Sequence, residues 1–188
     1  MINTNLILNV YKEKSLKSAL STQLLYGEKF KIIKKLGKFT KIKTTYDNYI
    51  GYIKSKKFKK NFNPTHKISS LSAHLYSKPS RKFKLKKKIS FCSFVKITGK
   101  KNNFLKFDRY WINKKDLLPI KINGSLFSKI RIFEGIKYKW GGNSFKGIDC
   151  SALVQIFYKF NNSFCPRDTK DQMKYFKKNV KLNKIKKN

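Results

Sequence analysis

The sequence predicts an α+β protein in which two small β-barrels precede a helical segment. Over about the first 118 of the 188 residues, short runs rich in β-branched and aromatic residues alternate with lysine and are separated by turn residues. Regular short strands with one half-buried face are typical of small barrels. From Cys150 onward, apolar residues instead recur at intervals of three and four, which predicts a helix with one buried face.

The first barrel is expected between residues 1 and 62. Gly27, Gly37 and the cluster at 46–48 mark turns between runs of strand composition, because glycine and Asp-Asn pairs favour turns. The expected strands cover residues 6–11, 29–36, 38–44 and 49–53.

A weaker pattern of the same kind predicts a second barrel between residues 63 and 118. Its expected strands lie near 75–76, 91–97, 104–107 and 110–112. Pro64 and Pro119 mark the joints on either side, because proline cannot continue a β-ladder and restricts the residue before it.

The third segment, residues 119–188, is expected to be mainly helical. Apolar spacing predicts a helix-like stretch over 125–135, a helix that starts at or next to Cys150 with its apolar face at 153–160, and a short helix from Thr169 to about Phe176. The lysine-rich tail from residue 177 to 188 has little periodicity and is expected to fray.

Cys150 lies where a glycine-rich turn enters the expected helix. Glycines at 141, 142 and 147 permit a sharp turn, and Asp149 is a good N-cap, so the cysteine falls in the first helical turn. There the unpaired N–H groups and the positive end of the helix dipole favour a thiolate. An inert, half-buried cysteine is the alternative, since free cysteine is among the most often buried residues.

The order of motifs around this cysteine resembles the start of the catalytic domain of NlpC/p60 cysteine peptidases, papain-like enzymes that cut bacterial cell-wall peptides. The resemblance runs from about residue 131 to 172 and includes Tyr-x-Trp-Gly-Gly at 138–142, Asp-Cys-Ser at 149–151 and Pro-Arg-Asp at 166–168. Ala152 and Cys165 depart from the family pattern. The resemblance implies that Cys150 is the nucleophile, acting through an acyl-enzyme, and it implies neither a cofactor nor a metal.

The runs at 9–11, 22–28 and 49–53 resemble a bacterial SH3 domain, and two SH3-like modules before such a segment resemble the γ-D-glutamyl-L-diamino acid endopeptidases. These enzymes cut murein-derived peptides that carry a free amino-terminal L-alanine. The resemblance implies that Tyr138 and Trp140 line the substrate site and that Tyr49 contributes from the first SH3-like module. The alternative for Tyr138 and Trp140 is a place in the hydrophobic core.

Four further polar residues are implied to serve the same site. By the resemblance, Asp149 and Ser151 flank the nucleophile, and Asp168, with Arg167 beside it, meets the amino group of the substrate. Asp149 is alternatively only a helix cap, and Arg167 with Asp168 is alternatively an ordinary ion pair of a turn.

A cysteine peptidase also needs an imidazole beside the sulfur, to take its proton and return one to the leaving amine. Family members supply this histidine from a β-sheet that follows the matched stretch, whereas the histidines here, His66 and His74, both lie upstream. Neither is assigned as the base. We therefore expect the sheet half of the papain-like domain to be missing and the chain alone to be inactive. The alternative function is a non-catalytic wall-binding or polyanion-binding SH3-like protein with a vestigial peptidase segment.

The charge is extreme: 46 lysines and arginines stand against nine acidic residues, for a formal net charge of +37. Such a chain binds polyanions non-specifically at low salt. Lysine, asparagine, isoleucine, phenylalanine and tyrosine are all encoded largely by A and T, however, and the lysines are spread along nearly the whole length. We therefore expect a solvated basic surface and no specific nucleic-acid partner, with adhesion to an anionic wall polymer or nucleic acid as the alternative.

Localisation is predicted from three features of the sequence. No stretch approaches the roughly 18 to 20 apolar residues of a membrane span. The amino terminus shows no secretory leader. Three cysteines without metal-ligand spacing favour a reducing compartment, so a cytoplasmic protein is expected.

Overall fold

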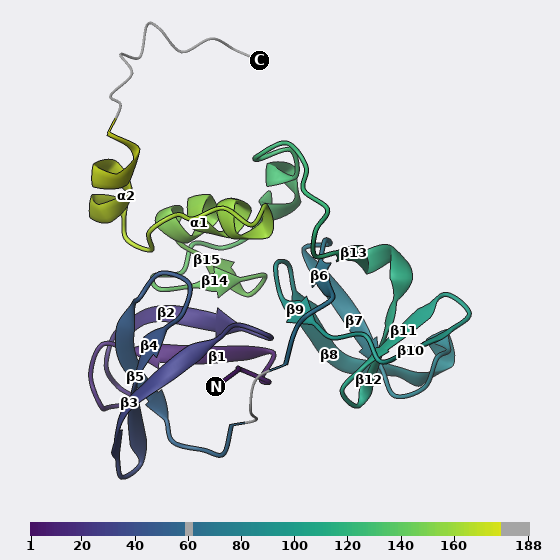
Figure 1. Cartoon of the computed structure of the whole chain (residues 1–188), viewed down its shortest axis with the longest axis horizontal. Coiled ribbons are helices and arrows are strands. Elements are labelled where there is room, and N and C mark those ends of the chain that lie inside the picture. Colours follow the sequence, from purple (N-terminus) through teal and green to yellow (C-terminus); the bar gives the residue numbers. More distant parts are fainter. Residues whose placement is uncertain (59–61, 178–188) are drawn as a thin grey trace, which may run out of the picture.

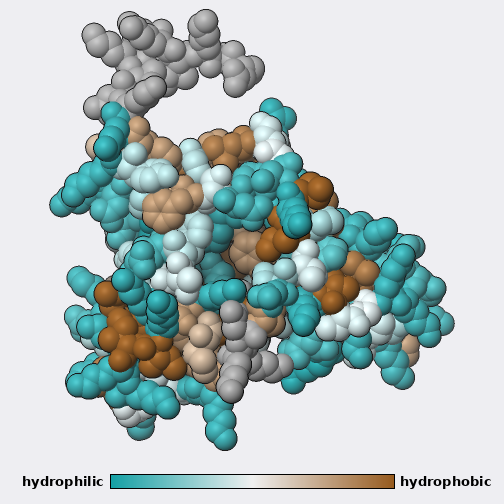
Figure 2. Space-filling model, in the orientation of Figure 1, coloured by the Kyte–Doolittle hydropathy of each residue, from teal (hydrophilic) through white to brown (hydrophobic). Residues whose placement is uncertain are grey.

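The computed structural model describes residues 1–58 and 62–177 of the chain. It is mostly β-structure with two α-helices, arranged as two sheet units side by side with the helices packed across the top of the first (Figure 1). Hydrophilic residues dominate the face shown in Figure 2, and apolar residues gather there in separate patches. Among the described residues, no helix has the length and apolar character needed to cross a membrane.

The first unit is an antiparallel five-stranded sheet of order β2-β1-β5-β4-β3. Burial alternates along β1 and β4, which sends Val10 and Ile42 into a small core together with Ile53 of β5. Four of the strands lie where the sequence predicts them. The five strands are β1 (Ile7–Tyr11), β2 (Leu20–Leu25), β3 (Phe30–Leu36), β4 (Phe39–Thr44) and β5 (Ile50–Lys54).

The second unit contains a five-stranded sheet of order β10-β11-β12-β7-β8 and a three-stranded sheet of order β13-β6-β9. The strand expected over 91–97 is reduced to two residues, because Cys92 adopts a left-handed conformation with φ of 61° in the preceding turn. The strands are β6 (His66–Ile68), β7 (Ser72–Tyr76), β8 (Lys84–Ser90), β9 (Phe94–Val95), β10 (Gly99–Lys101), β11 (Phe104–Phe107), β12 (Tyr110–Asn113) and β13 (Leu117–Pro119), with 3-10 turns η1 (Arg81–Phe83) and η2 (Lys114–Asp116).

The third segment contains both expected α-helices, α1 (Cys150–Phe160), which starts at the expected cysteine, and α2 (Thr169–Phe176). A two-stranded hairpin, β14 (Asn143–Ser144) and β15 (Gly147–Ile148), precedes α1. The helix-like stretch expected over 125–135 is wrong in extent: only η3 (Ile130–Phe133) forms, because Phe127 has a φ of 65° that no helix accommodates. The prediction of a frayed tail falls on residues 178–188, outside the described residues.

A shared core seats α1 at the junction of the two sheet units. Phe157 and Phe160 of the helix pack on Phe91 from the second unit, with ring centroids 5.5 and 4.5 Å apart, and Leu25 from β2 belongs to the same cluster. A buried ion pair between Lys159 and Glu28 adds a polar tie between α1 and the first unit. The entrance of α1 therefore has a fixed position relative to β2.

Candidate active site around Cys150

Cys150 is the first residue of α1, and its side chain is exposed. Asp149 caps the helix: its Oδ1 accepts a hydrogen bond of 2.8 Å from the Ala152 N–H. The exposure contradicts the alternative of a half-buried cysteine. Burial instead applies to Cys92 and Cys165, where it raises the pKa of the thiols to about 12 and about 11.

The glycine turn before Cys150 is pressed against the first sheet. Gly141 has a φ of +68°, and a Cβ there would lie 2.3 Å from the carbonyl oxygen of Leu20 in β2. Its N–H donates to Asp149 Oδ2 at 3.0 Å. Only glycine satisfies both the backbone conformation and the close approach, so this position couples the helix cap to β2.

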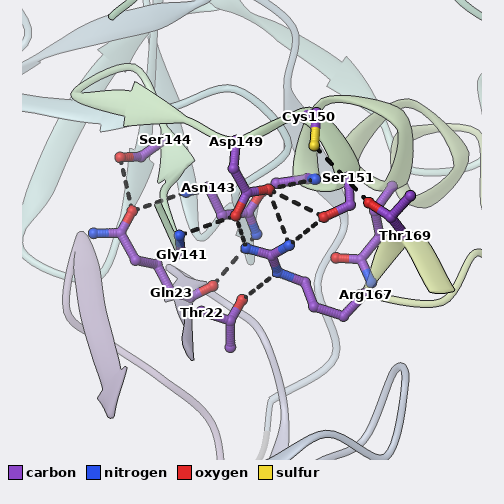
Figure 3. Close-up of polar contacts among 12 residues, drawn as sticks. Thr22, Gln23, Gly141, Asn143, Ser144, Asp149, Cys150, Ser151, Arg167 and Thr169 are labelled. Carbon is purple, nitrogen blue, oxygen red and sulfur yellow. Dashed lines mark hydrogen bonds and ion pairs between the residues drawn. The ribbon is translucent and has the colours of Figure 1, made fainter. Parts of the chain in front are cut away.

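Arg167 is the centre of the polar contacts in Figure 3. Its buried guanidinium donates to both carboxylate oxygens of Asp149, at 2.7 and 3.0 Å, and to Ser151 Oγ at 2.9 Å. Its Nε donates to Thr22 Oγ1 in β2 at 2.8 Å. The ion pair of Arg167 is thus with Asp149 and not, as in the alternative, with its neighbour Asp168.

A second bridge to β2 lies next to this one. Gln23 Oε1 accepts hydrogen bonds from the Asn143 N–H at 3.0 Å and from Ser144 Oγ at 3.1 Å. The reasoning from sequence missed Thr22 and Gln23. The signal was available as three polar residues, Ser21, Thr22 and Gln23, between leucines in the run at 20–25.

Cys150 faces a cavity of about 650 Å³ between the first sheet and the helical segment. The first unit contributes residues 19–21 of β2 and the turn before it, together with Ile50, and Thr169 of α2 closes another side. Trp140 is 72 % exposed and Tyr138 is 63 % exposed, which contradicts the core alternative for both rings. The cavity is lined by all eight residues that the sequence singles out: Tyr49, Tyr138, Trp140, Asp149, Cys150, Ser151, Arg167 and Asp168.

Two segments of the chain match models of known families. Residues 10–58 match the bacterial dipeptidyl-peptidase SH3 domain, and residues 135–187 match the NlpC/P60 family. This chain joins a segment similar to the dipeptidyl-peptidase SH3 domain to a segment similar to the NlpC/P60 family. The family resemblance seen in the sequence is thereby confirmed.

Two curated relatives carry the same name, gamma-D-glutamyl-L-lysine dipeptidyl-peptidase. The protein from Bacillus subtilis (strain 168) is 27 % identical over 177 residues, covering 84 % of this chain and 58 % of the relative. The protein from Bacillus cereus (strain ATCC 10987 / NRS 248) is 24 % identical over 180 residues, covering 81 % of this chain and 54 % of the relative. The chain therefore spans a little over half the length of these relatives.

A solved structure supports the fold of the NlpC/P60 segment and its SH3 domain together. The crystal structure of an NlpC/P60 family protein from Bacillus cereus ATCC 10987 superposes with a TM-score of 0.76 at 18 % identity, covering 92 % of this chain and 76 % of that one. At this identity the comparison shows the fold alone.

Asp168 and Tyr49 meet across the cavity, one from the NlpC/P60 segment and one from the SH3 domain. Burial raises the pKa of the Asp168 carboxyl, while the nearby Arg167 charge and a hydrogen bond from Tyr49 act in the opposite direction. Burial and then the Asp168 charge raise the pKa of Tyr49. A carboxyl group with a raised pKa therefore lies beside a phenol, at the end of the cavity that the first sheet unit closes.

The sulfur of Cys150 lies 3.9 Å from Thr169 Oγ1, and neither His66 nor His74 lines its cavity. His66, the first residue of β6, pairs through Nδ1 with the hydroxyl of Thr65, and His74 lies in β7 of the second unit. Burial lowers the pKa of both imidazoles. Within residues 1–58 and 62–177, no group of three or more metal-ligating side chains is placed to hold a metal ion.

Proposed function

We propose that this chain provides the nucleophile and substrate-binding part of a cysteine peptidase that cuts short bacterial wall peptides. The observation that supports this most is the gathering of eight residues, chosen from the sequence, around one cavity with the Cys150 thiol exposed on its wall. The names of the curated relatives and the NlpC/P60 match agree with this chemistry.

The proposed reaction is acyl transfer through Cys150. Its thiolate attacks the scissile carbonyl, the C–N bond breaks with protonation of the leaving amine, and water then hydrolyses the thioester. Backbone N–H groups at the start of α1 are positioned by the Asp149 cap and could stabilise the oxyanion. In this proposal Arg167 and Ser151 act mainly by holding Asp149, and through it the turn that carries the sulfur.

The proposed substrate is a peptide with a free amino-terminal L-alanine, cut at the γ-D-glutamyl-L-diamino acid bond. Asp168 would pair with its ammonium group, and Tyr49 would orient the carboxylate, because a carboxylate and an ammonium form a strong charge-assisted hydrogen bond. Tyr138 and Trp140 would form the walls beside the peptide. Leu20 and Ile50 from the first sheet close that end of the cavity, which favours a short substrate over an internal segment of a polymer.

The domain division that accompanies this proposal places an SH3-like barrel at 1–62, a second at 63–118 and a partial papain-like domain at 119–188. The antiparallel sheets of residues 7–54 and 66–119 agree with such a division. Neither His66 nor His74 lines the cavity of Cys150, so in this proposal residues 1–188 do not turn over substrate unless an imidazole is supplied.

Affinity labelling tests the proposal without requiring turnover. The peptide L-Ala-γ-D-Glu carrying a chloromethyl ketone at the γ-carbonyl should alkylate Cys150, with displacement of chloride by the sulfur. The expected result is a labelling rate at least about tenfold above that of the same reagent with an acetylated amine, because the acetyl group removes the charge that Asp168 recognises.

Two controls make the result specific. Asp168→Asn should abolish the preference for the free amine while leaving the rate of the acetylated reagent unchanged. Cys150→Ala should abolish labelling, and Cys165→Ala should not. Equal rates for the free and acetylated reagents would refute the proposed substrate, and labelling that persists in Cys150→Ala would refute the proposed nucleophile.

A further inference from the structure

A cavity of about 550 Å³ separates the amino-terminal strand from the second sheet unit, on residues that the proposed peptidase site does not use. One wall is Thr4 to Ile7, and another is formed by β8 and the turn before β12. The tip of the β14–β15 hairpin closes it with Phe145 and Lys146. Five cationic side chains line this cavity: Lys86, Lys87, Lys88, Arg109 and Lys146.

An irregular stretch of β8 gathers three of these charges. His74 pairs with Lys88 and Tyr76 pairs with Lys84. Between these pairs β8 advances by four residues and β7 by two, so β8 contains extra residues there. In a regular strand, successive side chains point to opposite faces, whereas extra residues of this kind re-aim them. Lys86, Lys87 and Lys88 therefore all line one cavity although they are consecutive.

The positive lining continues into a second cavity of about 640 Å³. The two cavities share Asn5, Ile7 and Lys146, which lie on both linings. The second adds Lys54, Lys56 and Lys139, so the two together form one surface, which we call the cationic groove. Lysines of the groove thus come from the first sheet, from β8 and from the NlpC/P60 segment.

No aspartate or glutamate is among the described residues that line either cavity. Asp108 acts on Arg109 and offsets part of its charge, and Lys56 donates to Asn5. Lys54, Lys86 and Lys146 are exposed and would be neutralised by solution counterions. A bound polyanion releases such counterions, which is the main source of affinity at a surface of this kind.

The aromatic rings of the groove offer little open surface for base stacking. Tyr110 is 7 % exposed; Lys87 Nζ lies 5.8 Å from its ring centroid and the guanidinium of Arg109 lies 5.3 Å from it. Tyr11 and Phe145 are half-buried. Single-stranded nucleic acids bind largely by stacking on exposed rings, so the groove suits a polyanion that lacks bases.

We propose that the cationic groove binds a phosphodiester polymer of polyol units, a flexible chain with one negative charge per repeat and no aromatic group. The spread of lysines over three segments fits an extended chain better than a single phosphate. This binding would hold the protein on an anionic polymer without involving Cys150, and it does not depend on the proposed peptidase activity.

The test compares two variants of equal net charge. One is Lys54→Gln/Lys86→Gln/Lys146→Gln, which takes one exposed lysine from each segment of the groove. The other is Lys31→Gln/Lys34→Gln/Lys100→Gln, whose lysines are equally exposed and line neither cavity. Binding of fluorescent poly(glycerol phosphate) of defined length is measured by anisotropy at several salt concentrations around 0.15 M, where long-range attraction is screened.

The groove variant should bind at least about tenfold more weakly than the wild type. The magnitude of its slope of log affinity against log salt should fall by about three. The affinity of the control variant should stay within about twofold of the wild-type affinity. Equal losses in both variants would overturn the proposal in favour of general charge attraction. An oligothymidine of equal charge should bind more weakly than the polyol polymer. Tighter binding of the oligothymidine would overturn the proposal in favour of nucleic acid.

Discussion

Arg167 holds Asp149 in a buried two-point contact, with Nη2 2.7 Å from Oδ2 and Nη1 3.0 Å from Oδ1. Asp149 caps the helix that begins at Cys150, and Arg167 also donates to Thr22 of the first sheet. The contact therefore fixes the turn that carries the sulfur relative to β2. Charge-assisted, two-point pairs of this kind are among the strongest polar contacts in proteins.

Replacing Arg167 by methionine should lower the free energy of unfolding by about 3 to 5 kcal/mol, because Asp149 is left buried without its partner. Urea unfolding monitored by tryptophan fluorescence measures this loss. Arg131→Met is the matched control, since Arg131 is exposed and should change stability by less than about 0.5 kcal/mol. The double variant Asp149→Asn/Arg167→Met should be less destabilised than the sum of the single changes. Strict additivity would argue against the pairing.

The hydroxyl of Thr22 should matter for Cys150 although it lies in the other domain. Thr22→Val removes the acceptor of the Arg167 Nε–H, at a cost of about 1.5 to 3 kcal/mol for a hydrogen bond to a charged group. We expect lower stability and an altered rate of Cys150 alkylation by iodoacetamide. Thr40→Val is the control, because Thr40 pairs with Ser55 inside the first sheet. An unchanged alkylation rate in Thr22→Val would contradict the coupling.

Alkylation of the native protein should stop at one cysteine. Cys150 is exposed, whereas burial raises the pKa of Cys92 to about 12 and of Cys165 to about 11, so few thiolates form at these two sites near neutral pH. Peptide mapping after limited iodoacetamide treatment should find the label on Cys150. Denatured protein serves as the control and should react at all three. Early labelling of Cys165 would contradict the burial of its side chain.

The buried carboxyl group of Asp168 should carry a stability penalty at neutral pH. Burial raises its pKa in the folded state, so the folded protein binds the proton more tightly than the unfolded chain does. Stability should therefore rise as pH falls through this pKa, and Asp168→Asn should raise the unfolding midpoint at neutral pH. Thermal unfolding between pH 4 and 8 measures both effects. A lower midpoint for Asp168→Asn at neutral pH would show that the carboxylate stabilises the fold instead.

The sequence predicts those elements whose pattern is local. Strands β1 and β4 alternate apolar and polar residues, and α1 combines a capping Asp149 with apolar spacing of three and four. The gathering of eight site residues in one cavity was also foreseeable, since most of them lie in one short motif. The roles of Tyr138, Trp140 and Asp168 in the site, like that of Tyr49 from the first sheet unit, were implied by the family resemblance.

Strands β2 and β8 and the contacts of Arg167 could not be predicted from the local sequence pattern. The last four residues of β2 are all buried because the helical segment covers the sheet there, so the strand lacks alternation. Strand β8 is rich in lysine and irregular in register, and most of its lysines face solvent, so it also lacks an alternating apolar pattern. The contact of Arg167 with Thr22 joins residues 145 positions apart, and only the tertiary fold brings them together.

Chemical rescue by imidazole tests most directly the claim that Cys150 is a nucleophile without its base. Residues 1–188 are incubated with an activated ester of L-Ala-γ-D-Glu, with and without added imidazole, and Cys150→Ala is assayed under the same conditions. The expected result is product release that requires both imidazole and Cys150, beyond the background that imidazole produces alone. Equal release from wild type and Cys150→Ala, or turnover by the wild type without imidazole, would contradict the account.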